Sequence, residues 1–131
     1  MIYIDTSAFL AVLDADDKNH PSAKKVWESL LTEEQPLSCS DYILVETIAI
    51  MQNRLGIEAV RSFHDNIFPL LTISWSEEAV YLTGLSNVLI AARRKLSLVD
   101  CISFEIMRRH GIRTVFTFDK HFKEQGFDCI P

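Results

Sequence analysis

The chain opens with Met1-Ile2-Tyr3-Ile4-Asp5-Thr6-Ser7, in which four residues of β-type apolar character are followed directly by an acid and two hydroxyls. The run is short and free of Gly and Pro, so it predicts a buried strand. A strand buried on both faces is typical of the middle of a parallel sheet. Because ligands of open α/β sheets bind outside the carboxyl ends of the strands, Asp5, Thr6 and Ser7 would lie at the functional edge. The simpler interpretation is that Asp5 or Thr6 only caps the helix that follows.

The rest of the chain alternates helical and strand-like stretches, with no repeat, low-complexity tract or linker. We expect helices at residues 8–13, 20–31, 42–55, 57–66, 76–95, 97–111 and 119–126, and further strands at 37–39, 69–73, 114–118 and 127–130. Strands that alternate with helices favour a mainly parallel central sheet covered by helices on both faces. The sequence therefore predicts one three-layer α/β/α domain over residues 1–131.

The composition limits the class of protein further. A chain of 131 residues is large enough for one domain with its own core, and a hydrophobic fraction of 48% predicts an apolar interface with a partner. No apolar run has transmembrane length, and Met1 leads into the strand without a secretory signal pattern. The three cysteines are widely spaced and form no C-x-x-C pair, so we expect reduced thiols in the cytoplasm, with no contact with a membrane.

The charge is distributed unevenly. The net charge is −5, but residues 91–131 contain eight Lys and Arg against five Asp and Glu. This basic third could face phosphate, although such a cluster can equally be a solvated surface. The candidate phosphate contacts are Arg93, Arg94, Lys95, Arg108, Arg109, Lys120 and Lys123.

Three further acids have settings that resemble that of Asp5 or are hard to explain as surface charge. Asp119 also follows an apolar strand, so both acids would lie at one edge of a parallel sheet. Asp100 matches a capping box with Ser97, yet its neighbours are apolar, which predicts a buried helix start. Glu46 lies in the apolar stretch 43–51, which predicts a helix with little water contact and no Lys or Arg within reach along it.

Four carboxylates that meet at one edge would repel one another, and a divalent cation would resolve the conflict. Oxygen ligands without His or Cys pairs select a hard ion, Mg²⁺ or Mn²⁺. Zinc is not expected, because no two of the four histidines have the i, i+4 spacing of metal ligands. These histidines are His20, His64, His110 and His121.

The chain resembles the PIN domains over nearly its whole length, and among them the VapC-type toxins of toxin–antitoxin pairs. The resemblance rests on Ile4-Asp5-Thr6-Ser7, Glu46, Leu96-Ser97-Leu98-Val99-Asp100-Cys101 and Thr117-Phe118-Asp119-Lys120-His121-Phe122. It implies a small α/β/α ribonuclease that depends on Mg²⁺ or Mn²⁺ and is silenced by a cognate antitoxin. It also implies an acidic quartet with direct metal ligands and supporting hydroxyls. The implied quartet is Asp5, Glu46, Asp100 and Asp119, the implied metal ligands are Asp5 and Asp100, and the implied hydroxyls are Thr6 and Thr117.

Three functions fit these features unequally. The first is an endoribonuclease that cuts single-stranded or looped RNA with a metal-activated water, which Asp119 or Glu46 would orient unless it holds a second ion. The second is a non-catalytic PIN-like module that binds protein, against which the intact quartet weighs. The third is a phospho-receiver domain, which needs a late strand-end Lys, whereas Lys120 directly follows an acid.

The expected partners besides RNA are a second copy of the chain and the antitoxin. The resemblance implies a homodimer face and an apolar groove for a helical antitoxin segment, and such a groove needs aliphatic and aromatic walls. Candidate walls, each of which could equally be a core residue, are Phe9, Leu10, Leu13, Trp27 and Leu44. An antitoxin Arg would compete with the metal for the acids through a bidentate contact.

Overall fold

The structure is a computed structural model that describes residues 1–131. Its strands are β1 (Ile2–Ile4), β2 (Leu37–Ser40), β3 (Leu71–Ser74), β4 (Thr114–Phe116) and β5 (Asp128–Ile130). Its helices are α1 (Thr6–Leu13), α2 (His20–Thr32), α3 (Asp41–Leu55), α4 (Ile57–Asn66), α5 (Glu78–Ala91), α6 (Leu98–Arg109) and α7 (His121–Glu124). A 3-10 turn, η1 (Phe68–Leu70), precedes β3.

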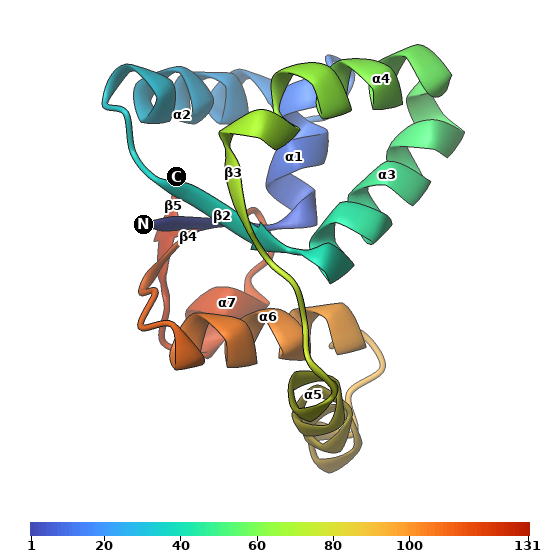
Figure 1. Cartoon of the computed structure of the whole chain (residues 1–131), viewed down its shortest axis with the longest axis vertical. Helices are drawn as coiled ribbons and strands as arrows, with labels where there is room; N and C mark the ends of the chain where they lie inside the picture. The colour runs from blue at the N-terminus through green and yellow to red at the C-terminus, as the bar shows by residue number, and fades with distance from the viewer.

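The five strands form one sheet in the order β3-β2-β1-β4-β5, and every neighbouring pair is parallel. Helices α1 to α4 cover one face and α5 to α7 the other, which gives three layers (Figure 1). The chain builds β2 and β3 on one side of β1 and then returns to build β4 and β5 on the other. The order therefore reverses beside β1, which is where open α/β sheets bind ligands. The predicted fold class is confirmed.

Strand β1 is the centre of the sheet, as its sequence predicted. Tyr3 and Ile4 point to opposite faces and are both 0% exposed, so both faces of the strand are covered. The Tyr3 hydroxyl lies 2.9 Å from the Ser103 hydroxyl of α6, so this buried hydroxyl has a hydrogen-bond partner on the face that α5 to α7 cover. Strand β4 pairs with β1 in register from Ile2 and Thr114 to Ile4 and Phe116.

Most predicted boundaries differ from those of the structure by one or two residues, and three of the differences have a local cause. The helix expected to reach residue 95 ends at Ala91, because Ala92 adopts a left-handed conformation with φ of 52°. The strand expected from residue 69 begins at Leu71, because Pro69 belongs to the 3-10 turn η1 that precedes it. The strand expected to reach residue 118 ends at Phe116, where the Thr117 hydroxyl accepts the Asp119 N–H at 2.9 Å and turns the chain.

Helix α3 is less shielded than predicted. Val45 is 70% exposed and Glu46 is only half-buried, so the expectation of a helix with little water contact is wrong. The helix packs against α1, α4 and α6, and these neighbours leave its outer face open. Of the five candidate groove walls, Phe9, Leu10 and Leu44 belong to the buried core, which is the alternative that the sequence left open, and Leu13 and Trp27 are half-buried. None of the helices is long and apolar enough to cross a membrane.

Candidate active site

Asp5 lies at the carboxyl end of β1 and is 4% exposed. Its Oδ2 accepts hydrogen bonds from the Ser7 hydroxyl at 2.6 Å, the Thr117 hydroxyl at 3.0 Å and the Ser7 N–H at 3.3 Å. The Ser7 hydroxyl in turn accepts the Phe118 N–H at 2.9 Å, which ties the start of α1 to the end of β4. Asp5 therefore caps α1 and is also held rigidly toward the edge of the sheet, with no hydrogen bond at Oδ1.

Asp100 enters the same edge from the first turn of α6 and is 8% exposed. Its N–H donates to the Ser97 hydroxyl at 3.1 Å, and its Oδ2 accepts the Ser97 N–H at 3.2 Å. The capping box expected from the sequence is present. The same box fixes the carboxylate, because one oxygen is bonded within the cap and Oδ1 is left without a hydrogen bond.

Asp119 follows β4 and shares the site with a histidine that the sequence analysis did not select. Asp119 Oδ1 accepts the His121 N–H at 2.9 Å, and the His121 ring Nδ1 lies 2.8 Å from the same oxygen. Nδ1 also lies 3.8 Å from Asp100 Oδ2. Ligand atoms of Asp100, Asp119 and His121 all lie within 4.8 Å of one another. The spacing of the histidines does not indicate His121, because its neighbours in the site are acids, Asp119 two residues before it and Asp100 in α6.

The three acids interact through their charges. Burial raises the pKa of Asp5 to about 6, and the nearby charges of Asp100 and Asp119 raise it further against the lowering effect of its hydrogen bonds. Burial, followed by repulsion from Asp119, also raises the pKa of Asp100. No Lys or Arg forms an ion pair with any of the three. A divalent cation among these oxygens would remove the repulsion, so the residues fit the hard metal ion that the sequence predicts.

The structure places Glu46 and Thr6 differently from the other predicted site residues. Glu46 projects from α3, forms no ion pair or hydrogen bond with the three acids, and is not among the groups that shift the pKa of Asp5 or Asp100. The Thr6 hydroxyl accepts a hydrogen bond from Thr47 of α3 at 3.2 Å. The hydroxyls that bond Asp5 are instead those of Ser7 and Thr117.

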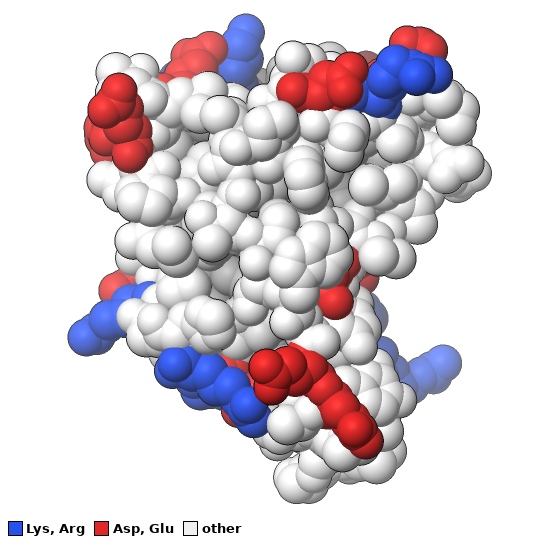
Figure 2. All heavy atoms as spheres, in the orientation of Figure 1, with Lys and Arg blue, Asp and Glu red and all other residues white.

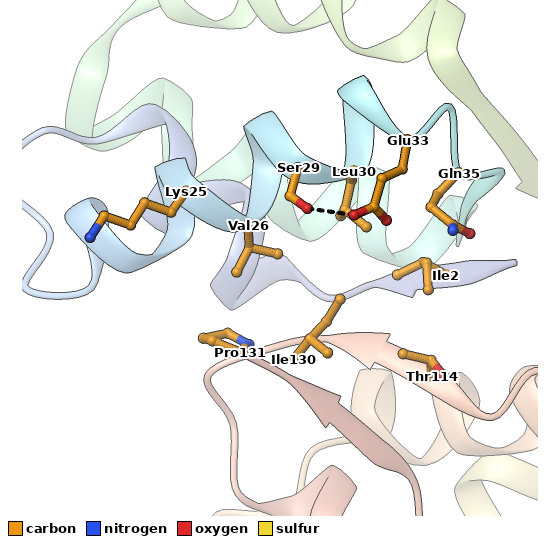
Figure 3. A pocket seen from close by; sticks show the side chains of 10 residues that line it. All are labelled: Ile2, Lys25, Val26, Ser29, Leu30, Glu33, Gln35, Thr114, Ile130 and Pro131. Carbon is orange, nitrogen blue, oxygen red and sulfur yellow. Dashed lines mark hydrogen bonds between the residues drawn. The ribbon is translucent and has the colours of Figure 1, made fainter.

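The most open apolar cleft is separate from the acids. It has a volume of about 450 Å³ and lies between α2 and the end of β5 (Figure 3). Val26, Leu30 and Ile130 form its apolar walls, and Glu33 accepts a hydrogen bond from Ser29 at 3.0 Å. Ile2 and Thr114 lie at the amino ends of β1 and β4, whereas Ile130 lies at the carboxyl end of β5, and none of the three site acids lines the cleft.

Comparison with known proteins identifies the family. The model of the PIN domain family matches residues 2–128. The chain belongs to the PIN-domain family. The recognition made from the sequence is thereby confirmed, and the cluster of three acids lies in a fold shared with nucleases.

Relatives with PIN-type folds include a toxin of Mycobacterium tuberculosis. The chain is 28% identical over 128 residues to the 23S rRNA-specific endonuclease VapC20 of strains H37Rv and CDC 1551, covering 97% of this chain and 95% of VapC20. The crystal structure of VapC20, described as a sarcin-ricin loop cleaving toxin, superposes with a TM-score of 0.85 at 26% identity, covering 97% and 96% of the two chains. FitAcB of Neisseria gonorrhoeae shares the fold, with a TM-score of 0.73, 18% identity and coverage of 100% and 97%.

We expect Asp5→Asn to stabilise the metal-free protein at neutral pH. The pKa of Asp5 is about 6 in the folded protein and about 3.9 in an unfolded chain. The folded state therefore binds more protons between these values, so its stability falls as the pH rises from about 4 to about 6 and then levels off. Two pKa units correspond to roughly 3 kcal/mol, and Asn keeps the shape without the charge.

The measurement is thermal unfolding in a chelator across this pH range. Asp5→Asn should melt several degrees above the wild type near pH 7, and its profile should slope less between pH 4 and 6. Asp65→Asn, on the exposed surface of α4, is the matched control and should follow the wild type. A metal-free Asp5→Asn protein that melts below the wild type near neutral pH would contradict the assigned repulsion.

Proposed function

We propose that this protein is a divalent-metal-dependent endoribonuclease and the toxin of a toxin–antitoxin pair. The observation that carries the proposal is the cluster of buried Asp5 and Asp100 with half-buried Asp119, at the edge of the sheet where β1 and β4 end and α6 begins, in a PIN domain. Similarity to an rRNA-specific endonuclease over nearly the full length of both chains supports it. The non-catalytic PIN-like module is the alternative, and three mutually repelling acids, two of them buried, would have no use in it.

Asp5 and Asp100 are the proposed ligands of a Mg²⁺ or Mn²⁺ ion. Each has one oxygen fixed by hydrogen bonds and a second oxygen that is free to bind. Such an ion supplies Lewis-acid stabilisation of a phosphate oxygen and lowers the pKa of a bound water. Ser7 and Thr117 hold the carboxylate of Asp5, and Ser97 holds that of Asp100, so both are oriented before the substrate arrives.

Asp119 is the proposed acceptor of the proton of the attacking water. It lies close enough to Asp5 and Asp100 to shift the pKa of both, and its Oδ2 makes no hydrogen bond. Glu46 and Thr6 remain in the proposed site, on the side that α3 forms. There the Thr47 hydroxyl of α3 donates to the Thr6 hydroxyl of α1. We assign Glu46 to the rim, where it would contact a second ion or the water shell of the first.

RNA is the proposed substrate, and Lys and Arg side chains near the acids would bind its phosphates. Of the seven candidate phosphate contacts, Arg93 and Arg109 form ion pairs with Glu124 and Glu105 at 2.9 and 2.6 Å, and Arg108 bonds Gln125. The remaining four are exposed and form no ion pair, which leaves them free for phosphate. These four are Arg94, Lys95, Lys120 and Lys123. Because VapC20 is a 23S rRNA-specific enzyme, a looped rRNA segment is the first substrate to test.

We expect Asp100→Asn to lose more than about 100-fold of RNA cleavage in Mn²⁺, since it removes a direct metal ligand. The capping box survives in part because Asn keeps an acceptor oxygen for the Ser97 N–H. The measurement is the cleavage rate of a labelled rRNA hairpin, with Asp128→Asn on the exposed end of β5 as the matched control. Equal rates for Asp100→Asn and the wild type, or cleavage that persists in a chelator, would sink the assignment.

We propose that the protein forms a homodimer through an apolar surface that is exposed in the single chain. Leu82, Leu89 and Ile90 lie on one face of α5 and are 53%, 69% and 79% exposed. Trp75 and Val45, 67% and 70% exposed, line a second apolar cleft beside α3. Figure 2 shows charged residues along the top of the molecule and across its lower third, with a largely uncharged band between them over β2 and β3. Monomers rarely expose so much apolar surface without a partner.

We expect the wild type to be a dimer of about twice 15.0 kDa at micromolar concentration. Leu89→Glu should convert it to a monomer, because it buries an unpaired charge in the interface. Asn87→Glu, on the same helix but off the apolar stripe, should leave the dimer intact. Light scattering after gel filtration decides the outcome, and a wild-type monomer at every concentration tested would exclude the dimer.

An antitoxin is the second proposed partner, with an Arg directed at the acids. The chain itself offers no Lys or Arg to Asp5, Asp100 or Asp119, so an incoming guanidinium would find free carboxylate oxygens for a bidentate contact. The same contact would exclude the metal ion and silence the enzyme. We place the pair in the cytoplasm, where the three free thiols would stay reduced.

We expect the product of the adjacent reading frame to co-purify with the protein and to relieve the growth arrest that the protein causes. Replacing the partner's Arg by Ala should abolish the relief while leaving a weaker complex. Co-expression with and without that reading frame is the measurement. If no neighbouring product binds or restores growth, the toxin assignment fails and a PIN-type nuclease remains.

A further inference from the structure

His121 carries the one buried side-chain nitrogen or oxygen in the chain that has no hydrogen-bond partner, its ring Nδ1. The residue is 7% exposed, so water does not replace the missing partner. An unpaired buried polar atom lowers the free energy of unfolding by about 1–3 kcal/mol. Such an atom therefore needs an explanation at a functional site.

The nitrogen is directed into the acid cluster. It lies 2.8 Å from Asp119 Oδ1 and 3.8 Å from Asp100 Oδ2, two oxygens that belong to different elements. The short distance to Asp119 is not an aligned hydrogen bond, and that oxygen already accepts the His121 N–H. Asp119 Oδ1 and Asp100 Oδ2 each accept a backbone N–H, from His121 and Ser97, so only Nδ1 lacks a partner. Ligand atoms of the three residues nevertheless lie within 4.8 Å of one another.

Their spacing is that of ligands around one ion. Neighbouring ligands of a six-coordinate ion with bonds of about 2.1 Å are about 3 Å apart. The observed separations of 2.8 and 3.8 Å bracket this value. The other histidines have different surroundings: His20 Nδ1 lies 2.8 Å from the Ala11 carbonyl oxygen, and His64 stacks on Phe68.

We propose that His121 is a nitrogen ligand of the same metal ion that Asp5 and Asp100 bind, with Asp119 beside it still free to accept a proton, and that it gives the site a preference for Mn²⁺ over Mg²⁺. The inference rests on the proposed metal-dependent function and adds a ligand to it. Imidazole nitrogen binds first-row transition ions well, whereas Mg²⁺ takes almost only oxygen ligands. The expectation of an oxygen-only ligand set, drawn from the spacing of the histidines, is replaced by a mixed set.

The test is pulsed electron paramagnetic resonance of the Mn²⁺-loaded wild type, which detects a directly bonded ¹⁴N nucleus. We expect ¹⁴N modulation in the wild type, its loss in His121→Gln and its retention in His110→Gln, which changes an exposed histidine. In parallel, thermal shift titrations should show the Mn²⁺ affinity of His121→Gln reduced by about 10-fold or more. Its Mg²⁺ affinity should change by less than about 3-fold, because Mg²⁺ gains little from nitrogen.

The outcomes separate this inference from the function on which it rests. Bound Mn²⁺ without ¹⁴N modulation in the wild type would overturn the role of His121 and leave a carboxylate metal site standing. A folded wild type that binds neither Mn²⁺ nor Mg²⁺ would overturn both. The wild-type spectrum needs no variant, so the inference remains testable even if His121→Gln fails to fold.

Discussion

The repulsion among three clustered carboxylates, two buried and one half-buried, is the constraint on which the site depends. Asp5, Asp100 and Asp119 come from β1, α6 and the segment after β4, and burial raises the pKa of the first two. Hydrogen bonds from Ser7, Thr117 and Ser97 keep the carboxylates oriented despite the repulsion. The fold therefore holds an arrangement that is unfavourable without a cation, which is how a preorganised metal site differs from a surface cluster of acids.

The strand order explains why these acids meet. β1 is central, and the chain turns back beside it, so the carboxyl ends of β1 and β4 open into the crevice where helices leave toward opposite faces. Asp5 caps the helix on one face, and Asp100 belongs to the first turn of a helix on the other. Each acid is thus placed by ordinary capping chemistry, and only the sheet order makes the caps neighbours.

The large apolar side chains that remain exposed are concentrated on a few elements. The core takes Phe9, Leu10 and Leu44, while α3, α5 and the segment at Trp75 keep large apolar side chains in water. Four Lys and Arg residues without an ion pair lie instead on the segments that flank Asp100 and Asp119, namely Arg94, Lys95, Lys120 and Lys123. A surface divided in this way suits a protein that has separate faces for protein and for nucleic acid.

The sequence by itself determined the parallel three-layer fold, the strand-end acids and the capping box, because local periodicity and capping rules act over a few residues. Only the tertiary structure decided which side chains share the site. Ser7 rather than Thr6 bonds Asp5, since consecutive residues of a helix point about 100° apart. His121 lies near Asp100 because α6 and the segment after β4 converge in space. The outer face of α3 is exposed because its helix neighbours, α1, α4 and α6, do not cover it. Neither the contact between His121 and Asp100 nor the exposure of α3 corresponds to a pattern of residue spacing in the sequence.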